Sequence, residues 1–423
     1  MIRTRSPYRR SLGYRLAQFA TWVDEQRRAS PRLDEEWLER RALTIAEHPS
    51  FAGISFREPL HRLVASLRGE ARLNALGRAH AAGTLLGQLV TRACLETNWC
   101  GPTPRSQDLL RPARPPVFIF GLHRTGTTLL QRLLAADPAA RPLLYWESYN
   151  PLVTIDRGRA NGSPAARRQS ATDVLNIVRR IAPYLDGIHD TEADGPEECY
   201  WLLMASLVTE AFPLQWRVGG YRDWLDARTE ADWDAAYREY LSLLHLLDGG
   251  MTDRHWVLKC PFHAPRVDTL ARLVPTAIFV QTYRDIRESA GSLCSMTTAL
   301  RAMGSDTWDP VGDGRDVLAG LRRSMPAAMR AARLHPDRVI DVHYRDLVRD
   351  PTATIRRIYE RAGLPWTVDA EAAIRSRLAS GTQHGGGRHR YSLAEFGLAE
   401  ADVEAACPEY VDMERRILLG QRS

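Results

Sequence analysis

The chain has 423 residues, of which 44% are hydrophobic and 26% charged, a composition typical of a globular protein and not of a disordered one. Its net charge of +6 favours anionic ligands, but the basic residues are spread along the chain, so the charge pattern does not indicate nucleic-acid binding. The longest apolar runs are shorter than the roughly 18 residues that a membrane helix needs, and we expect no membrane span.

The cysteine and lysine contents are both informative. The six cysteines include no Cys-x-x-Cys pair and no histidine spacing typical of zinc, which predicts free thiols, no metal and a cytoplasmic location. The 57 basic residues include a single lysine, Lys259. In a chain that otherwise uses arginine, a compact ammonium can mark a site that a planar guanidinium does not suit. The alternative is chance in a biased composition.

The N-terminal part, residues 1–114, is predicted to be an all-helical region. Apolar residues recur there at helical spacing, as in the segment from Leu85 to Val90, with glycine and proline between the segments. The Arg/Pro-rich connector 111–116 cannot continue a helix and marks the boundary. Residues 115–423 then form the second unit, which ends in a helical tail.

Short apolar runs in this second unit predict β-strands. They occupy residues 117–120, 256–258, 277–280 and 339–342, and helical stretches separate them. Such alternation predicts an α/β fold, with a P-loop-like parallel sheet flanked by helices.

A glycine loop follows the first of these strands. Residues 121–128 read Gly-Leu-His-Arg-Thr-Gly-Thr-Thr, the spacing of a nucleotide phosphate loop with threonine in place of its lysine. Backbone N–H groups and the start of the next helix can hold a phosphate in such a loop. The spacing alone predicts a phosphate site and does not choose the nucleotide.

Residues 116–130 resemble the 5′-phosphosulfate loop of PAPS-dependent sulfotransferases, in the bacterial branch that shares Arg-(Ser/Thr)-Gly-Thr-Thr with tyrosylprotein sulfotransferases. The resemblance extends over about residues 116 to 396. It implies that the donor's phosphosulfate is bound by Arg124, Thr125, Gly126, Thr127 and Thr128. That branch more often has proline where this chain has His123. The cytosolic enzymes have a tryptophan, which stacks on adenine, where this chain has Leu129.

The resemblance also implies a second phosphate site. Arg284, at a predicted strand end, and Ser292, eight residues later, match the pair that holds the donor's 3′-phosphate; the alternative is that Arg284 pairs with Asp285. Tyr344 matches a tyrosine near adenine, with a half-buried aromatic anchor as its alternative. Arg388 and Arg390, in a glycine-rich basic loop, match a segment that closes over the 3′-phosphate, with a solvated loop as the alternative.

Three residues are predicted to be catalytic. Lys259 matches a lysine that supports transfer by stabilising charge on the departing phosphate. The acceptor hydroxyl also requires a general base, and the candidates are Glu147, which we prefer, and His263. Either could instead be structural, Glu147 as an ion-pair partner of an arginine and His263 as a helix cap. Glu197 and Glu198 are predicted to cap the helix that follows them.

The resulting expectation is a sulfotransferase that moves a sulfuryl group from PAPS to a hydroxyl or phenol of a small-molecule acceptor, without a metal, and releases PAP. One alternative is a P-loop kinase or NTPase, which the missing loop lysine disfavours. The other is an inactive nucleotide-binding partner protein, which the retained Lys259 and two base candidates disfavour. The N-terminal helices would cover the acceptor pocket or mediate association into a homo-oligomer.

Overall fold

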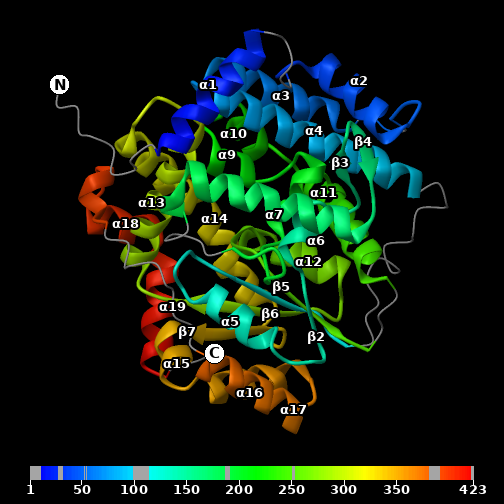
Figure 1. Cartoon of the computed structure of the whole chain (residues 1–423). Helices are drawn as coiled ribbons and strands as arrows, with labels where there is room; N and C mark the ends of the chain where they lie inside the picture. The colour runs from blue at the N-terminus through cyan, green and yellow to red at the C-terminus, as the bar shows by residue number, and fades with distance from the viewer. Residues whose placement is uncertain are drawn as a thin grey trace.

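A computed structural model describes residues 11–26, 32–51, 53, 55–98, 114–185, 191–249, 253–380 and 391–420. At its centre lies a parallel five-stranded sheet (Figure 1), with the strand order β2 (Ala140–Pro142), β5 (His255–Lys259), β1 (Val117–Gly121), β6 (Ile278–Tyr283) and β7 (Val339–His343). The predicted α/β class and the four predicted strands are confirmed. The short edge strand β2 was not predicted, because Ala-Arg-Pro has no β-branched or aromatic run to indicate it.

Both faces of the sheet are buried, as expected for parallel strands. Successive side chains alternate between the faces, so Phe118 and Phe120 belong to one core cluster, whereas Val117 and Ile119 belong to another. The second cluster is completed by α5 (Thr127–Leu134), α16 (Pro351–Ala362) and α17 (Val368–Ala379). The first is completed by helices that include α11 (Glu230–Asp248), α12 (Val267–Leu273), α13 (Ile286–Gly304) and α14 (Pro310–Leu334).

The described N-terminal residues are helical, as predicted, in α1 (Leu12–Gln26), α2 (Glu35–Ala46), α3 (Arg57–Gly69) and α4 (Ala75–Asn98). They lie at the end of the molecule opposite α16 and α17 (Figure 1). Leu63 of α3 and Leu85 of α4 are buried in the same cluster as Phe118. These helices therefore share a core with the sheet.

The remaining elements connect these layers. They are α6 (Tyr145–Tyr149), β3 (Thr154–Asp156), β4 (Arg159–Asn161), α7 (Pro164–Ile181), α8 (Tyr200–Leu203), α9 (Ala211–Gln215), α10 (Gly219–Asp226), α15 (Tyr344–Arg349), α18 (Glu400–Ala406) and α19 (Pro408–Leu418), with short 3₁₀ segments that include η3 (Pro261–Arg266). No helix within the described ranges has the length and hydropathy to cross a bilayer.

The contact between α4 and α13 has no room for a side chain. A Cβ on Gly77 would lie 1.9 Å from the carbonyl oxygen of Gly304. We expect Gly77→Ala to lower the free energy of unfolding by about 1–3 kcal/mol, because the backbones must move apart. Gly83→Ala, on the same helix with no atom within 4 Å of the added Cβ, should instead stabilise by about 0.5–1 kcal/mol. Urea unfolding measures both, and equal effects would contradict the predicted close packing.

Candidate functional site

The glycine loop connects β1 to α5 through two residues in the left-handed region. Arg124 has φ 68° and Gly126, the N-cap of α5, has φ 92°. A Cβ on Gly126 would lie 2.9 Å from Cδ2 of Tyr344, so glycine is required there by both conformation and space. The turn brings the backbone to the N-terminus of α5, the arrangement that binds anions.

The loop residues differ in what they leave available for a ligand. Thr125 is fully buried; its hydroxyl donates to the carbonyl of Leu122 at 2.6 Å and lies 2.6 Å from the hydroxyl of Thr282 on β6. This side chain therefore ties the loop to the sheet. Arg124 is exposed, Thr127 is buried and Thr128 is half-buried at the first turn of α5.

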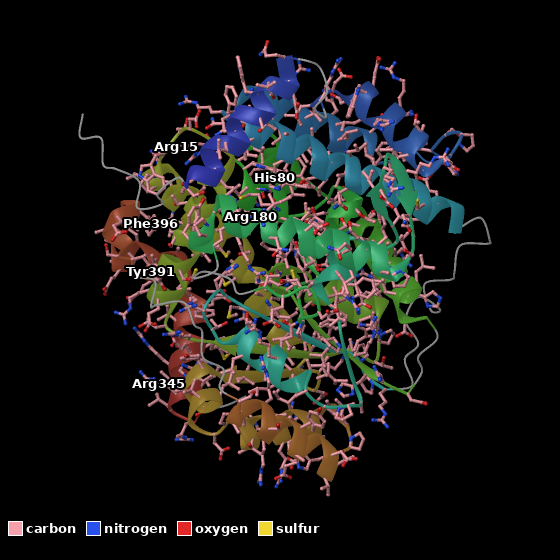
Figure 2. All side chains as sticks on the ribbon, viewed as in Figure 1. Arg15, His80, Arg180, Arg345, Tyr391 and Phe396 are labelled. Atoms are coloured by element: carbon pink, nitrogen blue, oxygen red, sulfur yellow. The ribbon has the colours of Figure 1, made fainter. Side chains whose placement is uncertain are left out.

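The second predicted phosphate site lies against the same loop. Arg284 donates from Nη1 to the carbonyl of Arg124 at 3.0 Å, and its guanidinium lies 4.3 Å from the centre of the Tyr344 ring. Because Tyr344 also covers Gly126, the structure brings together Arg284, Tyr344 and the loop, which are far apart in sequence. Arg345, which follows Tyr344 in the chain, is exposed at the surface and is labelled in Figure 2.

A carboxylate lies beside Arg284 on α13. Arg284, which lies between the end of β6 and the N-cap of α13, forms an ion pair with Glu288 of that helix. Ser292 follows Glu288 by one helical turn on the same side of α13. The alternative partner of Arg284, Asp285, instead pairs with Arg287. Ser292 is half-buried.

Arg388 and Arg390 lie outside the described residues. The chain is described again from Tyr391, whose hydroxyl donates to the carbonyl of Glu288 at 3.3 Å. A Cβ on Gly291 would lie 2.9 Å from the Tyr391 ring, which is labelled in Figure 2. Tyr391, the first described residue after the basic segment, therefore lies against α13 at Gly291, next to Ser292 in the chain.

Lys259 is the last residue of β5, and its side chain is only 1% exposed. It pairs in register with Ile119, two residues before the glycine loop, and the backbone N–H of Cys260 donates to the carbonyl of Ile119 at 3.0 Å. Its Nζ donates to Oε1 of Glu198 at 2.5 Å. Lys259 thus lies at the end of the strand next to β1, and its partner Glu198 was not predicted.

Glu197 and Glu198 do not cap α8, so that prediction is wrong. The N-cap of α8 is Cys199, and no side chain caps it. Glu197 accepts from the backbone N–H of Glu198 at 2.8 Å, while Glu198 pairs with Lys259. The two glutamates directly precede the helix, a position compatible with capping, but the buried ammonium of Lys259 attracts the Glu198 carboxylate more strongly than the helix N-terminus does.

Glu147, the preferred base candidate, is buried and paired with an arginine. It is 7% exposed and forms a bidentate pair with Arg141, with distances of 2.7 and 2.8 Å. It also accepts from the backbone N–H of Leu144 at 3.1 Å. Arg141 is in register with Trp256, three residues before Lys259. These contacts match the alternative of an ion-pair partner and do not bring Glu147 to the loop.

His263, the other base candidate, is fully buried within η3. Its Nδ1 lies 3.0 Å from the hydroxyl of Tyr237, and its ring packs edge-on against Phe118. Burial lowers the pKa of His263 to about 3, so the ring is neutral near pH 7. Both base candidates are therefore buried, and the choice of general base stays a prediction.

The buried histidines predict a loss of stability in acid. Burial also lowers the pKa of His255 to about 4. Since an unfolded histidine has a pKa near 6.5, the unfolded chain binds protons between about pH 6.5 and 4 that the folded chain does not. Stability should therefore be full above pH 6.5 and fall as the pH drops, by up to about 1 kcal/mol per pH unit for each histidine. Urea unfolding at pH 7, 6 and 5 measures the slope. His263→Gln should make it shallower, and an unchanged slope would contradict this assignment.

A cavity of about 540 Å³ lies beside the loop. Its wall includes Leu122 and His123 of the loop, Phe262 after Lys259, and Thr297 of α13. Thr297 lines the cavity, and its buried hydroxyl has no hydrogen-bond partner. His123, for which the sequence offered no role, lines this cavity; neither Glu147 nor His263 does.

The described part of the chain contains no group of three His, Cys, Asp or Glu side chains that could hold a metal ion. The five cysteines within it are free and buried.

Known proteins resemble this chain in sequence and in fold. The model of the sulfotransferase family matches residues 115–368. Two curated relatives, the omega-hydroxy-beta-dihydromenaquinone-9 sulfotransferases Stf3 of Mycobacterium bovis and Mycobacterium tuberculosis, are each 25% identical over 273 residues. That match covers 60% of this chain and 63% of each relative, so the chain spans less than two thirds of the length of these curated relatives.

Two solved structures share the fold. Sulfotransferase STF1 of Mycobacterium tuberculosis superposes with a TM-score of 0.73 at 30% identity, covering 88% of this chain and 97% of that protein. Sulfotransferase STF9 of Mycobacterium avium superposes with a TM-score of 0.74 at 25% identity, covering 89% and 96%. With a family model matched over more than half of its length and a solved relative matched over nearly all of that relative's chain, the protein belongs to the sulfotransferase family.

Proposed function

We propose that this chain is an enzyme that transfers a sulfuryl group from PAPS to a hydroxyl group of a small-molecule acceptor and releases PAP. One observation carries the proposal: Arg284 donates to the backbone of the glycine loop and packs on Tyr344, which itself covers Gly126. The glycine loop and Arg284 would therefore act as one site, with groups that can bind a nucleotide carrying both a 5′- and a 3′-phosphate.

The residues would divide the donor as follows. Backbone N–H groups at the N-terminus of α5, with Arg124, Thr127 and Thr128, would hold the 5′-phosphosulfate. Arg284 and Ser292 would hold the 3′-phosphate, and the Tyr344 ring would lie near adenine. Arg388 and Arg390 would close over the 3′-phosphate, which the contact of Tyr391 with α13 supports. Thr125 and Gly126 shape the loop.

In the transfer step, the bond between sulfur and the bridging phosphate oxygen breaks, and a bond from sulfur to the acceptor oxygen forms. The electron pair of the broken bond stays on the phosphate of PAP, and the acceptor hydroxyl gives its proton to a general base, which returns it to solvent. Lys259 would stabilise the negative charge that develops on the bridging oxygen. Glu147 and His263 remain sequence predictions for the general base. Their filled or buried environments do not support that role.

The acceptor would bind in the 540 Å³ cavity beside the loop. Its wall combines apolar residues such as Leu214 and Phe262 with charged residues such as Arg222 and Asp226, and such a mixed wall suits an alcohol or phenol with an apolar body. The curated relatives are named for a hydroxylated menaquinone acceptor, which supports a hydroxyl as the group modified. The free cysteines support the further proposal of a cytoplasmic location.

Titration with PAP followed by transfer of labelled sulfate from PAPS to a panel of phenols and alcohols tests the proposal. PAP should raise the melting temperature more than adenosine 5′-phosphate, which lacks the 3′-phosphate, and at least one acceptor should be labelled. No shift with millimolar PAP would refute the donor assignment. Binding of PAP without transfer to any acceptor would favour the inactive binding protein, and Mg²⁺-dependent ATP turnover would favour the kinase or NTPase.

A further inference from the structure

The single lysine of this chain is buried against the carboxylate of Glu198. Lys259 is 1% exposed, and Glu198, whose Oε1 lies 2.5 Å from Nζ, is 13% exposed. An ammonium taken out of water tends to lose its proton unless an opposite charge lies close to it. The role proposed for Lys259 requires the charged form, so the charge must be held by its surroundings.

Glu198 is held in place by backbone contacts on both sides. The N–H of Cys199 donates to the carbonyl of Lys259 at 2.9 Å, and the N–H of Glu197 donates to the carbonyl of Leu143 at 2.8 Å. From the phosphate-loop helix, Nε2 of Gln131 donates to the carbonyl of Glu197 at 3.0 Å. The segment that carries Glu198 is thus fastened to the strand of Lys259 and to the helix that follows the glycine loop.

Other ionisable groups around the pair include Glu197, Cys199 and Tyr200 of the same segment, Cys260, which follows Lys259, and Tyr240 of α11, against which His263 packs. Burial raises the pKa of Cys199 to about 12 and the pKa values of Tyr200, Tyr240 and Cys260 well above their usual values, so these groups are neutral near pH 7. Burial likewise keeps His263 neutral. Glu197 directs Oε1 at a backbone N–H. Glu198 is therefore the carboxylate in contact with the ammonium.

We propose that Glu198 is a positioning residue for sulfuryl transfer, which keeps Lys259 protonated and holds its ammonium beside the glycine loop. The inference rests on the proposed function, because it assigns Glu198 a task through Lys259. In this role, Glu198 makes no bond to the acceptor and takes no proton from the acceptor.

The single lysine allows a direct measurement. Lysine labelled with ¹³C at Cε gives one NMR signal from the full chain, whose shift reports the protonation of Lys259 as the pH is raised. In Glu198→Gln the signal should titrate about 1–3 pH units lower than in the wild type. In Glu198→Asp, whose side chain is shorter by one methylene, the lysine titration should move in the same direction by a smaller amount. Glu409→Gln removes an exposed carboxylate that pairs with Arg333, and the lysine signal of this variant should titrate as in the wild type.

The pH dependence of kcat provides the functional readout. In Glu198→Gln the alkaline limb of the profile should move down by the same amount as the lysine titration, with activity retained at lower pH. A variant that is inactive at every pH would instead indicate that Glu198 accepts the acceptor's proton, and would overturn the positioning role.

The proposal is also overturned if the lysine signal of Glu198→Gln titrates as in the wild type. If Glu198→Gln does not fold, the same result in Glu198→Asp overturns it. The NMR titration needs neither donor nor acceptor. A wild type that fails to bind PAP therefore refutes the proposed function, while the titration still decides whether Glu198 holds the charge of Lys259.

Discussion

Replacing Lys259 with methionine is expected to lower kcat by about 10²- to 10³-fold, the usual effect of removing one donor that stabilises developing charge. Methionine has a similar length and suits a buried position, so the strand should keep its packing. The affinity for PAP should change much less than kcat, because an interaction that strengthens in the transition state contributes little to ground-state binding. Rates of labelled sulfate transfer and calorimetric titration with PAP measure the two quantities.

The control for this variant is its partner. Lys259→Met leaves the Glu198 carboxylate buried without its cation, which destabilises the fold on its own. The double variant with Glu198→Gln removes both charges and should recover stability but not kcat. Lys259→Arg should also be slow, since a planar guanidinium does not replace a compact ammonium in a buried site. A methionine variant with wild-type kcat would remove Lys259 from the mechanism.

Replacing Arg284 with methionine is expected to weaken PAP binding by about 10- to 100-fold, the loss of a charge-assisted hydrogen bond to a phosphate. Adenosine 5′-phosphate, which lacks the 3′-phosphate, should bind nearly as it does to the wild type. The preference for PAP over adenosine 5′-phosphate should therefore disappear. Calorimetric titration with both nucleotides measures this preference.

Arg349→Met is the matched control for the Arg284 variant. Arg349 is 83% exposed and pairs only at 3.7 Å with Asp346 on its own helix, so its loss should leave both affinities unchanged. If Arg284→Met weakened both nucleotides equally, Arg284 would support the loop through the Arg124 carbonyl instead of reading the 3′-phosphate.

Local sequence patterns were sufficient to predict the longer strands of the sheet. The buried run at 117–120 contains consecutive apolar and β-branched residues, and it became β1 at the centre of the sheet. Strand β2 has only three residues, Ala140–Pro142, and owes its conformation to pairing with β5. The shared core between α4 and the sheet likewise depends on contacts such as Gly77 against Gly304, which no local pattern contains.

The candidate site divides in the same way. The glycine loop is a local motif whose geometry depends on residues 121–128, and Lys259 could be singled out because it is the only lysine. Glu147 had a suitable position in the sequence, but Arg141, brought beside it by the turn after β2, occupies both of its oxygens. For His263, burial under Tyr237 of α11 decided its protonation.

By itself, the sequence determined the parallel α/β fold, because the fold depends on short-range periodicity. It also predicted a phosphate loop with Lys259, Arg284 and Tyr344 as its partners, because each belongs to a recognisable motif. Only the tertiary structure decided that Lys259 pairs with Glu198, 61 residues away, that Arg284 and Tyr344 meet at Gly126, and that His123 lines a cavity. The physical reason is that charge and access depend on burial and on opposite charges within a few ångströms, which chain folding creates between residues distant in sequence.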